Sequence, residues 1–419
     1  MKYKTYNCNS FNIYTIKTDR FKTSHLEVIF KNVLKKEEIG TYSFLADMLS
    51  EGCKKYPRKK DLITRFEELY KIVIYASTMR VGNVIDLHFS LDFINPEYIE
   101  DEGYIEDVIK TLFEVILNPN VCNDEFDLKT FNIVKERLRR EINSLKENPV
   151  KQSIKEAIKT MDSNSPTSYE ILGTIEELEN ITPAKLYNAY KSLRKNFKVD
   201  VFLIGNLDMD NVASLIKKYF KNRYIVSDNF EVMVDNKETK KVKEKAMKSD
   251  NIQTNLVMLF NLKNLSELEK NITLNCFNYL YGSGGLTSKL YKSIREENSL
   301  CYAINSMYLK YDKLLMVQIS LDNCNVKKAI SLVKKELKSM QNGNFSEEEV
   351  RDAINNMVIS LDMSLDNNIA ILNNYVFNIY DKLPSIEERK EYFKKLTKED
   401  IVNVSKKVKL NTIFTLEGR

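Results

Sequence analysis

Histidine is nearly missing from this sequence, and tryptophan is missing altogether. Two histidines, His25 and His88, occur among 419 residues. A zinc site of three histidines, or a pair of histidines one helical turn apart, needs more histidine at closer spacing than the chain provides. Reactions that depend on such a site are therefore nearly excluded for this chain acting alone.

Other absences bear on the compartment and on the partners. The six cysteines are scattered without a C-x-x-C pair, which is typical of free thiols in a reducing compartment. No stretch approaches the roughly 18 uninterrupted apolar residues of a membrane span, and the N-terminus lacks an apolar signal segment. The 64 basic and 59 acidic residues are mixed along the chain, so no basic face favours nucleic acid. We predict a cytoplasmic protein with no membrane span and no nucleic-acid partner.

An internal repeat is the most informative pattern that is present. Alternating residues predict a strand over Thr23–Phe30, and the stretch Ile39–Gly52 that follows has helical spacing and a closing glycine. The second half has the same order, with a strand predicted over Thr254–Phe260 and a helix over Ile272–Gly285. Many α+β domains would give one such match, so the repeat depends on further matches in the same order.

A later pair of segments supplies those matches. Thr182 and Thr397 each stand at an N-cap position before a helical pattern, and a buried-looking strand follows that ends near Gly205 or Gly418. The difference in residue number between matched positions of the two halves falls toward the end of the repeat. The first half must therefore hold extra residues between the two matched regions. We predict that these extra residues lie in Ile94–Asp107.

The matches divide the chain into two homologous halves. We predict an N-terminal domain over residues 1–222, a charged linker over residues 223–250 and a C-terminal domain over residues 251–419. The Lys-rich stretch Lys237–Lys248 also contains acids, and we interpret it as part of this solvated linker. Each half is expected to be an α+β domain of mostly antiparallel strands covered by helices.

The stretch Gly40–Pro57, GTYSFLADMLSEGCKKYP, resembles the zinc-binding segment of the pitrilysin/insulinase family of peptidases, the inverzincins, which usually reads G-x-x-H-F-L-E-H-M-L-F-x-G-T-x-K-Y-P. Where that family has its first histidine, its catalytic glutamate and its second histidine, this chain has Ser43, Ala46 and Asp47. The resemblance places the family's third zinc ligand, a glutamate on a later helix, at Glu141.

These substitutions remove the metal chemistry of the motif. In H-x-x-E-H the two histidines share one zinc ion and the glutamate takes a proton from the bound water. Ser43 is a poor zinc ligand, Ala46 cannot act as a base, and Asp47 cannot replace a pair of imidazoles. We expect no metal in this chain and interpret these positions as parts of a helix pair. The alternative is an oxygen-only metal site at Asp47 and Glu141, which would need further ligands.

A second signature of the same family is retained. The stretch Gly282–Ser306, GSGGLTSKLYKSIREENSLCYAINS, resembles the family segment in which an arginine and a tyrosine seven residues apart face the zinc from the C-terminal domain. These are Arg295 and Tyr302 here. A guanidinium and a phenol hydroxyl suit the oxyanion that forms when water attacks a peptide carbonyl. The structural alternatives are that Arg295 pairs with Glu296 or Glu297, and that Tyr302 is a core aromatic.

The combination resembles the incomplete subunit of small two-chain bacterial peptidases of this family, and it is most similar to a group named for association with elongation factor P 5-aminopentanol modification. The resemblance implies a half-shell of two pitrilysin-like domains, a homologous H-x-x-E-H partner subunit that binds the zinc, and a peptide substrate. Alone, the chain is expected to be inactive. The alternative is a non-enzymatic peptide-binding or scaffold protein. A hydrolase that uses Ser43 and Asp47 lacks a nearby histidine base.

Overall fold

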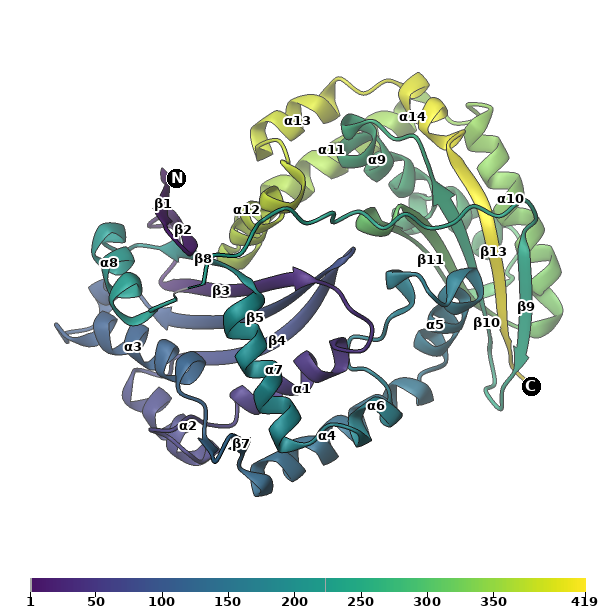
Figure 1. The fold of residues 1–419 in the computed structure, drawn as a ribbon. Helices are drawn as coiled ribbons and strands as arrows, with labels where there is room; N and C mark the ends of the chain where they lie inside the picture. The colour runs from purple at the N-terminus through teal and green to yellow at the C-terminus, as the bar shows by residue number, and fades with distance from the viewer. Residues whose placement is uncertain (1, 223) are drawn as a thin grey trace. The chain divides into compact units, whose positions relative to one another are not determined.

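The computed structural model describes residues 2–222 and 224–419; Arg223, the first residue of the predicted linker, lies outside the described residues. The chain forms two compact units, each assembled from separate segments (Figure 1). Unit 1 comprises residues 1–143, 169–232 and 367–377, and unit 2 comprises residues 144–168, 233–366 and 378–419.

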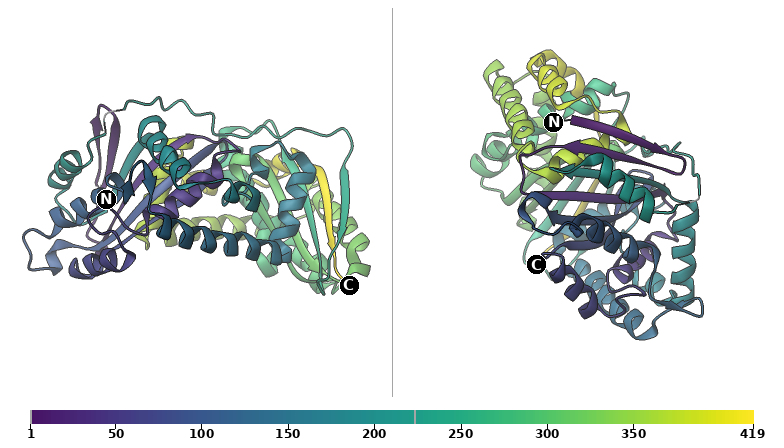
Figure 2. Two further views of the ribbon diagram at one scale, coloured as in Figure 1. Left: turned by 60° about the horizontal axis from the view of Figure 1, so that its bottom comes forward. Right: turned by 90° about the vertical axis from the view of Figure 1, so that its left-hand side faces the viewer.

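The sheet of unit 1 has six strands in the order β1-β2-β8-β3-β5-β4. Its pairs are antiparallel except for β2 and β8, which run parallel. β1 and β2 form the hairpin at the N-terminus, drawn in purple in Figure 2. The strands are β1 (Lys2–Cys8), β2 (Phe11–Lys17), β3 (Thr23–Val33), β4 (Val73–Val81), β5 (Val84–Ile94) and β8 (Lys198–Gly205).

Helices cover one face of this sheet, where alternate strand residues such as Val28 and Phe89 are fully buried. The apolar face of α1 packs there through Phe44 and Leu45, both without exposed surface, as expected for an amphipathic helix against a sheet. The helices are α1 (Ile39–Leu49), α2 (Lys59–Glu68), α3 (Tyr104–Leu117), α4 (Leu128–Glu147, in unit 1 as far as Asn143), α6 (Ile175–Glu179), α7 (Pro183–Asn196) and α8 (Met209–Tyr219), and a small pair of strands is formed by β6 (Val121–Cys122) and β7 (Glu125–Phe126).

The sheet of unit 2 has five strands in the order β11-β12-β10-β13-β9. β9 and β13 run parallel, and the other pairs are antiparallel. The strands are β9 (Lys243–Lys248), β10 (Thr254–Leu262), β11 (Cys301–Leu309), β12 (Leu314–Leu321) and β13 (Val408–Glu417). The helices of the second half are α9 (Leu274–Asn278), which π-type turns flank on both sides, α10 (Val326–Gln341), α11 (Glu347–Ser364), α12 (Asn368–Asp381), α13 (Ile386–Lys394) and α14 (Lys398–Ser405).

The two sheets share one topology. Strands β2, β8, β3, β5 and β4 correspond in order and direction to β9, β13, β10, β12 and β11. Before β8 and β13, the predicted caps form: the Thr182 hydroxyl accepts from the Lys185 N–H at 3.2 Å, and that of Thr397 from the Asp400 N–H at 3.3 Å. The predicted α+β fold of two homologous, mostly antiparallel domains is confirmed.

The packing units are not continuous halves of the sequence. Helix α5 (Pro149–Asp162) belongs to unit 2, where Ile158 and Met161 pack on Leu259 of β10 and Phe414 of β13. Most of α12 belongs to unit 1, where Tyr375 stacks on Tyr3 with ring centroids 5.3 Å apart. Each half of the sequence therefore contributes one helix, α5 or α12, to the other packing unit. The predicted domain ranges 1–222 and 251–419 do not include this exchange.

Two expectations about connecting segments need correction. The stretch predicted as solvated linker contains strand β9, which pairs with β13 because Lys243–Lys248 lies beside an otherwise open edge. The extra residues of the first half are divided among three connections instead of lying in Ile94–Asp107 alone. These connections join β5 to α3, α3 to α4 and α5 to α6, and each is longer than its match in the second half, which joins β12 to α10, α10 to α11 and α12 to α13, respectively.

Candidate functional site

Ser43, at the position of the family's first histidine, is part of the packing of unit 1. It is buried in α1, and its hydroxyl donates to the carbonyl of Ile171 at 2.5 Å. The Thr78 hydroxyl on β4 lies 2.6 Å from the Ser43 hydroxyl oxygen. Because one proton and two lone pairs serve these contacts, Ser43 joins a helix to a strand and a loop.

Ala46 and Asp47 are held in different ways. Ala46 is buried and has no group that could act on a substrate. Asp47 forms an ion pair with the Arg137 guanidinium, in which Arg137 Nη2 and Asp47 Oδ2 are 3.3 Å apart. The other terminal nitrogen, Arg137 Nη1, donates a hydrogen bond to Glu51 Oε1 at 2.8 Å. Burial raises the pKa of the Asp47 carboxyl, and Arg137 opposes this rise. Arg137 extends from α4, so it connects the two helices that carry the degenerate motif.

Glu141 lies on an exposed position of α4, one helical turn after Arg137. Across residues 2–222 and 224–419, no three histidine, cysteine, aspartate or glutamate side chains converge in a way that could hold a metal ion. The donors at positions 43, 46, 47 and 141 do not fit zinc, since a bonded hydroxyl, a methyl group and an arginine-paired carboxylate replace the imidazoles and the base.

Both histidines are engaged away from Ser43. His25 Nδ1 lies 2.7 Å from Asp92 Oδ1, and His88 Nδ1 lies 2.6 Å from Glu27 Oε1, in the sheet of unit 1. A serine nucleophile needs a base within hydrogen-bond reach. The arrangement therefore gives no support to a hydrolase based on Ser43 and Asp47.

Arg295 lies at the end of the helical turn η6 (Tyr291–Glu296) in unit 2. Ser299, with a left-handed φ of 51°, ends the helix, and the Leu300 N–H returns to the Ile294 carbonyl at 3.0 Å. The Arg295 guanidinium is exposed and lies 5.0 Å from the centre of the Tyr291 ring. Within the described part of the chain no carboxylate forms an ion pair with it, so the pairing with Glu296 or Glu297 is not seen.

Tyr302 is the second residue of β11, and 56% of its surface is exposed. The register of β11 against β12 shifts between Cys301 and Ala303, so Tyr302 is the extra residue of a bulge. Bulges re-aim side chains at the ends of edge strands. The phenol hydroxyl donates to Asp322 Oδ1 over a long 3.3 Å. Tyr302 is therefore not the core aromatic of the alternative interpretation.

The two side chains lie on neighbouring elements. Helical turn η6 contacts β11, and the charge of Arg295 acts on the thiol of Cys301, where burial raises the pKa and Arg295 lowers it. Gly282 permits the close approach of this region, because a Cβ at this position would lie 2.6 Å from the Ser306 hydroxyl. Gly282 therefore serves packing in this region.

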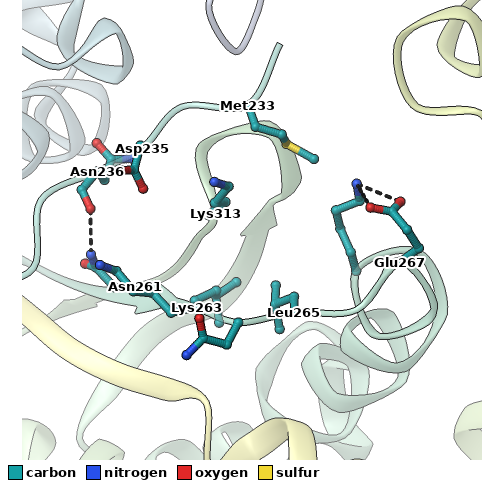
Figure 3. Close-up of a pocket in the computed structure, with 11 residues that line it drawn as sticks. Met233, Asp235, Asn236, Asn261, Lys263, Leu265, Glu267 and Lys313 are labelled. Atoms are coloured by element: carbon teal, nitrogen blue, oxygen red, sulfur yellow. Dashed lines mark hydrogen bonds and ion pairs between the residues drawn. The ribbon is translucent and has the colours of Figure 1, made fainter. Parts of the chain in front are cut away.

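A cavity of about 490 Å³ in unit 2 is separate from these residues (Figure 3). Its lining is polar and includes an ion pair between Lys270 and Glu267 and a contact from the Asn261 amide to the Asn236 carbonyl at 3.3 Å. Neither Arg295 nor Tyr302 lines it. No local pattern indicates this cavity, because its residues come from separate loops and strand ends.

Arg137 is the site residue that sequence reasoning missed. A signal existed, since Arg137 precedes Glu141 by four residues and so shares its helix face. That spacing shows which face Arg137 occupies but not that Asp47 and Glu51 lie opposite.

Comparisons with known proteins agree with this geometry. Residues 180–357 match the family described as Peptidase M16 inactive domain. The chain is 26% identical over 412 residues to the "Probable inactive metalloprotease YmfF" of Bacillus subtilis (strain 168), which covers 96% of this chain and 95% of that protein. Part of the chain is thus similar to the M16 peptidase inactive domain, and its whole length is similar to a protein described as a probable inactive metalloprotease.

Solved structures show the same fold. A conserved protein from Enterococcus faecalis V583 superposes with a TM-score of 0.94 at 23% identity, covering 100% of this chain and 99% of that one. A peptidase M16 inactive domain from Pseudomonas fluorescens gives a TM-score of 0.82 at 16% identity, with 100% and 99% coverage. The chain therefore has the fold seen in M16-like peptidases. In the described residues no helix has the length and apolarity to cross a membrane.

Proposed function

We propose that this chain is the zinc-free subunit of a two-chain M16 peptidase, and that it supplies Arg295 and Tyr302 to a peptide bound by the pair. A contrast within the chain supports this. The zinc-motif positions Ser43, Ala46 and Asp47 are occupied in packing or pairing. Arg295 and Tyr302 remain exposed on neighbouring elements, with one long hydrogen bond and one ring contact between them and their surroundings.

The chemistry follows from these two groups. A homologous partner with an intact H-x-x-E-H motif would supply the zinc, the attacking water and the base. The planar guanidinium of Arg295 can hold a substrate carbonyl or carboxylate through two N–H groups. The Tyr302 hydroxyl can leave its weak bond to Asp322 and donate to the oxyanion. Alone, the chain has a binding role and does not cleave peptides.

Edge strands offer the peptide a second mode of attachment. β11 begins next to Arg295 and carries Tyr302, and it lies at the edge of its sheet; β4 lies at the edge of the sheet of unit 1. An extended peptide that adds to such an edge gains main-chain hydrogen bonds regardless of its sequence. This mode suits a subunit with broad peptide affinity.

The same proposal includes three further points. The whole chain belongs to the M16 family, it is located in the cytoplasm, and it is one of the subunits associated with elongation factor P 5-aminopentanol modification. The low histidine content, the dispersed cysteines and the two motif resemblances support them. A non-enzymatic peptide-binding or scaffold protein is the rival function.

The experiment compares variants in the complex purified from the source cells. Arg295→Ala and Tyr302→Phe should each lower peptide turnover by about 10- to 100-fold, while the yield of assembled complex stays the same. Arg351→Ala on α11 and Tyr392→Phe on α13, both exposed in unit 2, are the matched controls. Loss of assembly without a separate loss of turnover would favour the scaffold. Unchanged turnover in both variants would contradict the catalytic contribution.

A further inference from the structure

A single arginine joins the two helices that carry the positions matched to the zinc ligands by the motif resemblance. Arg137 Nη2 lies 3.3 Å from Asp47 Oδ2, and Arg137 Nη1 lies 2.8 Å from Glu51 Oε1. Asp47 lies in the last turn of α1 and Glu51 lies just after the end of this helix, and their side chains are 30% and 12% exposed. The planar fork of a guanidinium suits such a bridge between two acceptors.

The place of this bridge is informative. Asp47 stands where the motif resemblance puts the second histidine ligand, and Arg137 precedes by one turn the position matched to the third ligand, Glu141. A zinc ion in a complete motif would connect the same two helices by its charge. Here α1 and α4 are connected at that level by a side chain of the protein.

The local charges show what the guanidinium does. The Asp47 and Glu51 carboxylates both contact the same guanidinium and repel each other, and burial raises the pKa of Asp47 because it disfavours the charged form. Besides Arg137, Lys59 of α2 approaches the pair, with Nζ 4.0 Å from Glu51 Oε1. Removal of Arg137 would leave two half-buried carboxylates with this one distant cation.

We propose that Arg137, whose side chain is 44% exposed, is a permanent cation supplied by the chain itself that replaces the charge of the metal ion, holding α4 against α1 and neutralising Asp47 and Glu51. The guanidinium would repel a divalent ion at this place. Introducing the missing histidines alone would therefore not create a favourable metal site, because the metal ion would still lie beside the positive charge of Arg137. This inference does not rest on the proposed function, because it concerns how the chain remains folded without zinc.

The test is thermal unfolding of the full chain, at pH 7 and at pH 4. Arg137→Met should lower the midpoint by about 3–6 °C at pH 7. Arg140→Met is the matched control, since Arg140 is exposed on the same helix and donates to the Glu136 carbonyl; it should shift the midpoint by less than about 1 °C. The triple variant Arg137→Met/Asp47→Asn/Glu51→Gln should recover at least half of the loss.

The pH profile separates charge from packing. Because burial raises the pKa of Asp47, the charge on Asp47 is reduced at pH 4, so Arg137→Met should lie closer to the wild type than at pH 7. If Arg137→Met does not fold at pH 7, folding of the triple variant supports the proposal and its failure overturns it. A triple variant as unstable as Arg137→Met, or an Arg137→Met midpoint equal to that of Arg140→Met, would also overturn it.

Discussion

The buried histidine His88 should make unit 1 less stable as the pH rises above neutral. His88 on β5 faces Glu27 on β3, with Nδ1 2.6 Å from Glu27 Oε1, and its Nε2 lies 3.8 Å from Asp86 Oδ2. Both side chains of the closer pair are less than a tenth exposed. The Ser90 hydroxyl donates to the same Glu27 oxygen at 3.3 Å. His25, on the same face of the sheet, also interacts electrostatically with the Glu27 carboxylate. The pair is thus shielded from solvent and hydrogen-bonded.

The magnitude follows from the two ionisation states. Burial disfavours the imidazolium, but the hydrogen bond to Glu27 and the attraction of the nearby Asp86 and Glu27 carboxylates outweigh it and raise the pKa of His88 from 6.5 to about 9. A folded-state pKa above the unfolded one stabilises the fold fully below the unfolded value, and this contribution is lost as pH rises through the folded value. The shift corresponds to about 3 kcal/mol, lost between roughly pH 6.5 and pH 9.

Urea unfolding at pH 6, 8 and 10 measures this loss, with Glu27→Gln as the comparison. The amide keeps the shape of the side chain but removes its charge, so the pKa of His88 should fall. The wild type should then lose about 3 kcal/mol of unfolding free energy with rising pH, and Glu27→Gln clearly less. Equal losses in both proteins would refute the reasoning, because other groups that titrate in this range are common to them.

Three further changes test other parts of the structure. Ser43→Ala should lower the unfolding free energy by about 1–3 kcal/mol, because it leaves the Ile171 carbonyl and the Thr78 hydroxyl without their buried partner; no change in urea unfolding would contradict this. Leu259→Ala should cost about 2–5 kcal/mol in the same assay, since Leu259 is fully buried beneath α5; a cost below 1 kcal/mol would argue against the exchanged helix. Tyr302→Phe should leave stability within about 0.5 kcal/mol of the wild type, because the ring is exposed and its hydrogen bond is long.

Local patterns in the sequence were sufficient for much of the fold. The alternation in Thr23–Phe30 and the apolar run in Thr254–Phe260 mark the central strands, which are buried along nearly their whole length. The caps Thr182 and Thr397 mark helix starts because their hydroxyls satisfy backbone N–H groups that the helix leaves open. Each signal lies within a few residues, so one sequence is enough to detect it.

Long-range packing was not accessible in the same way. The pattern of α5 shows that one face is buried, but the same pattern would fit either sheet, and the helix packs on β10 and β13. Strand β9 has an exposed, charged composition that resembles a linker, and it forms because β13 offers an edge for pairing. Main-chain hydrogen bonds at a sheet edge place few demands on the side chains.

The candidate site shows the same division. The resemblance of Gly282–Ser306 to the family segment identified Arg295 and Tyr302, whose exposure agrees with an outward role. The spacing gave no sign of the bulge that carries Tyr302 or of the contact between Arg137 and α1. Both depend on residues that are distant in the sequence.

Purification of the chain from its source cells, with identification of co-purifying proteins and zinc analysis, tests the central claim most directly. The shared-site account predicts a near-stoichiometric homologous partner that carries H-x-x-E-H, with about one zinc per pair. A solitary chain with neither partner nor metal would contradict it and would leave a peptide-binding protein derived from a peptidase as the better account.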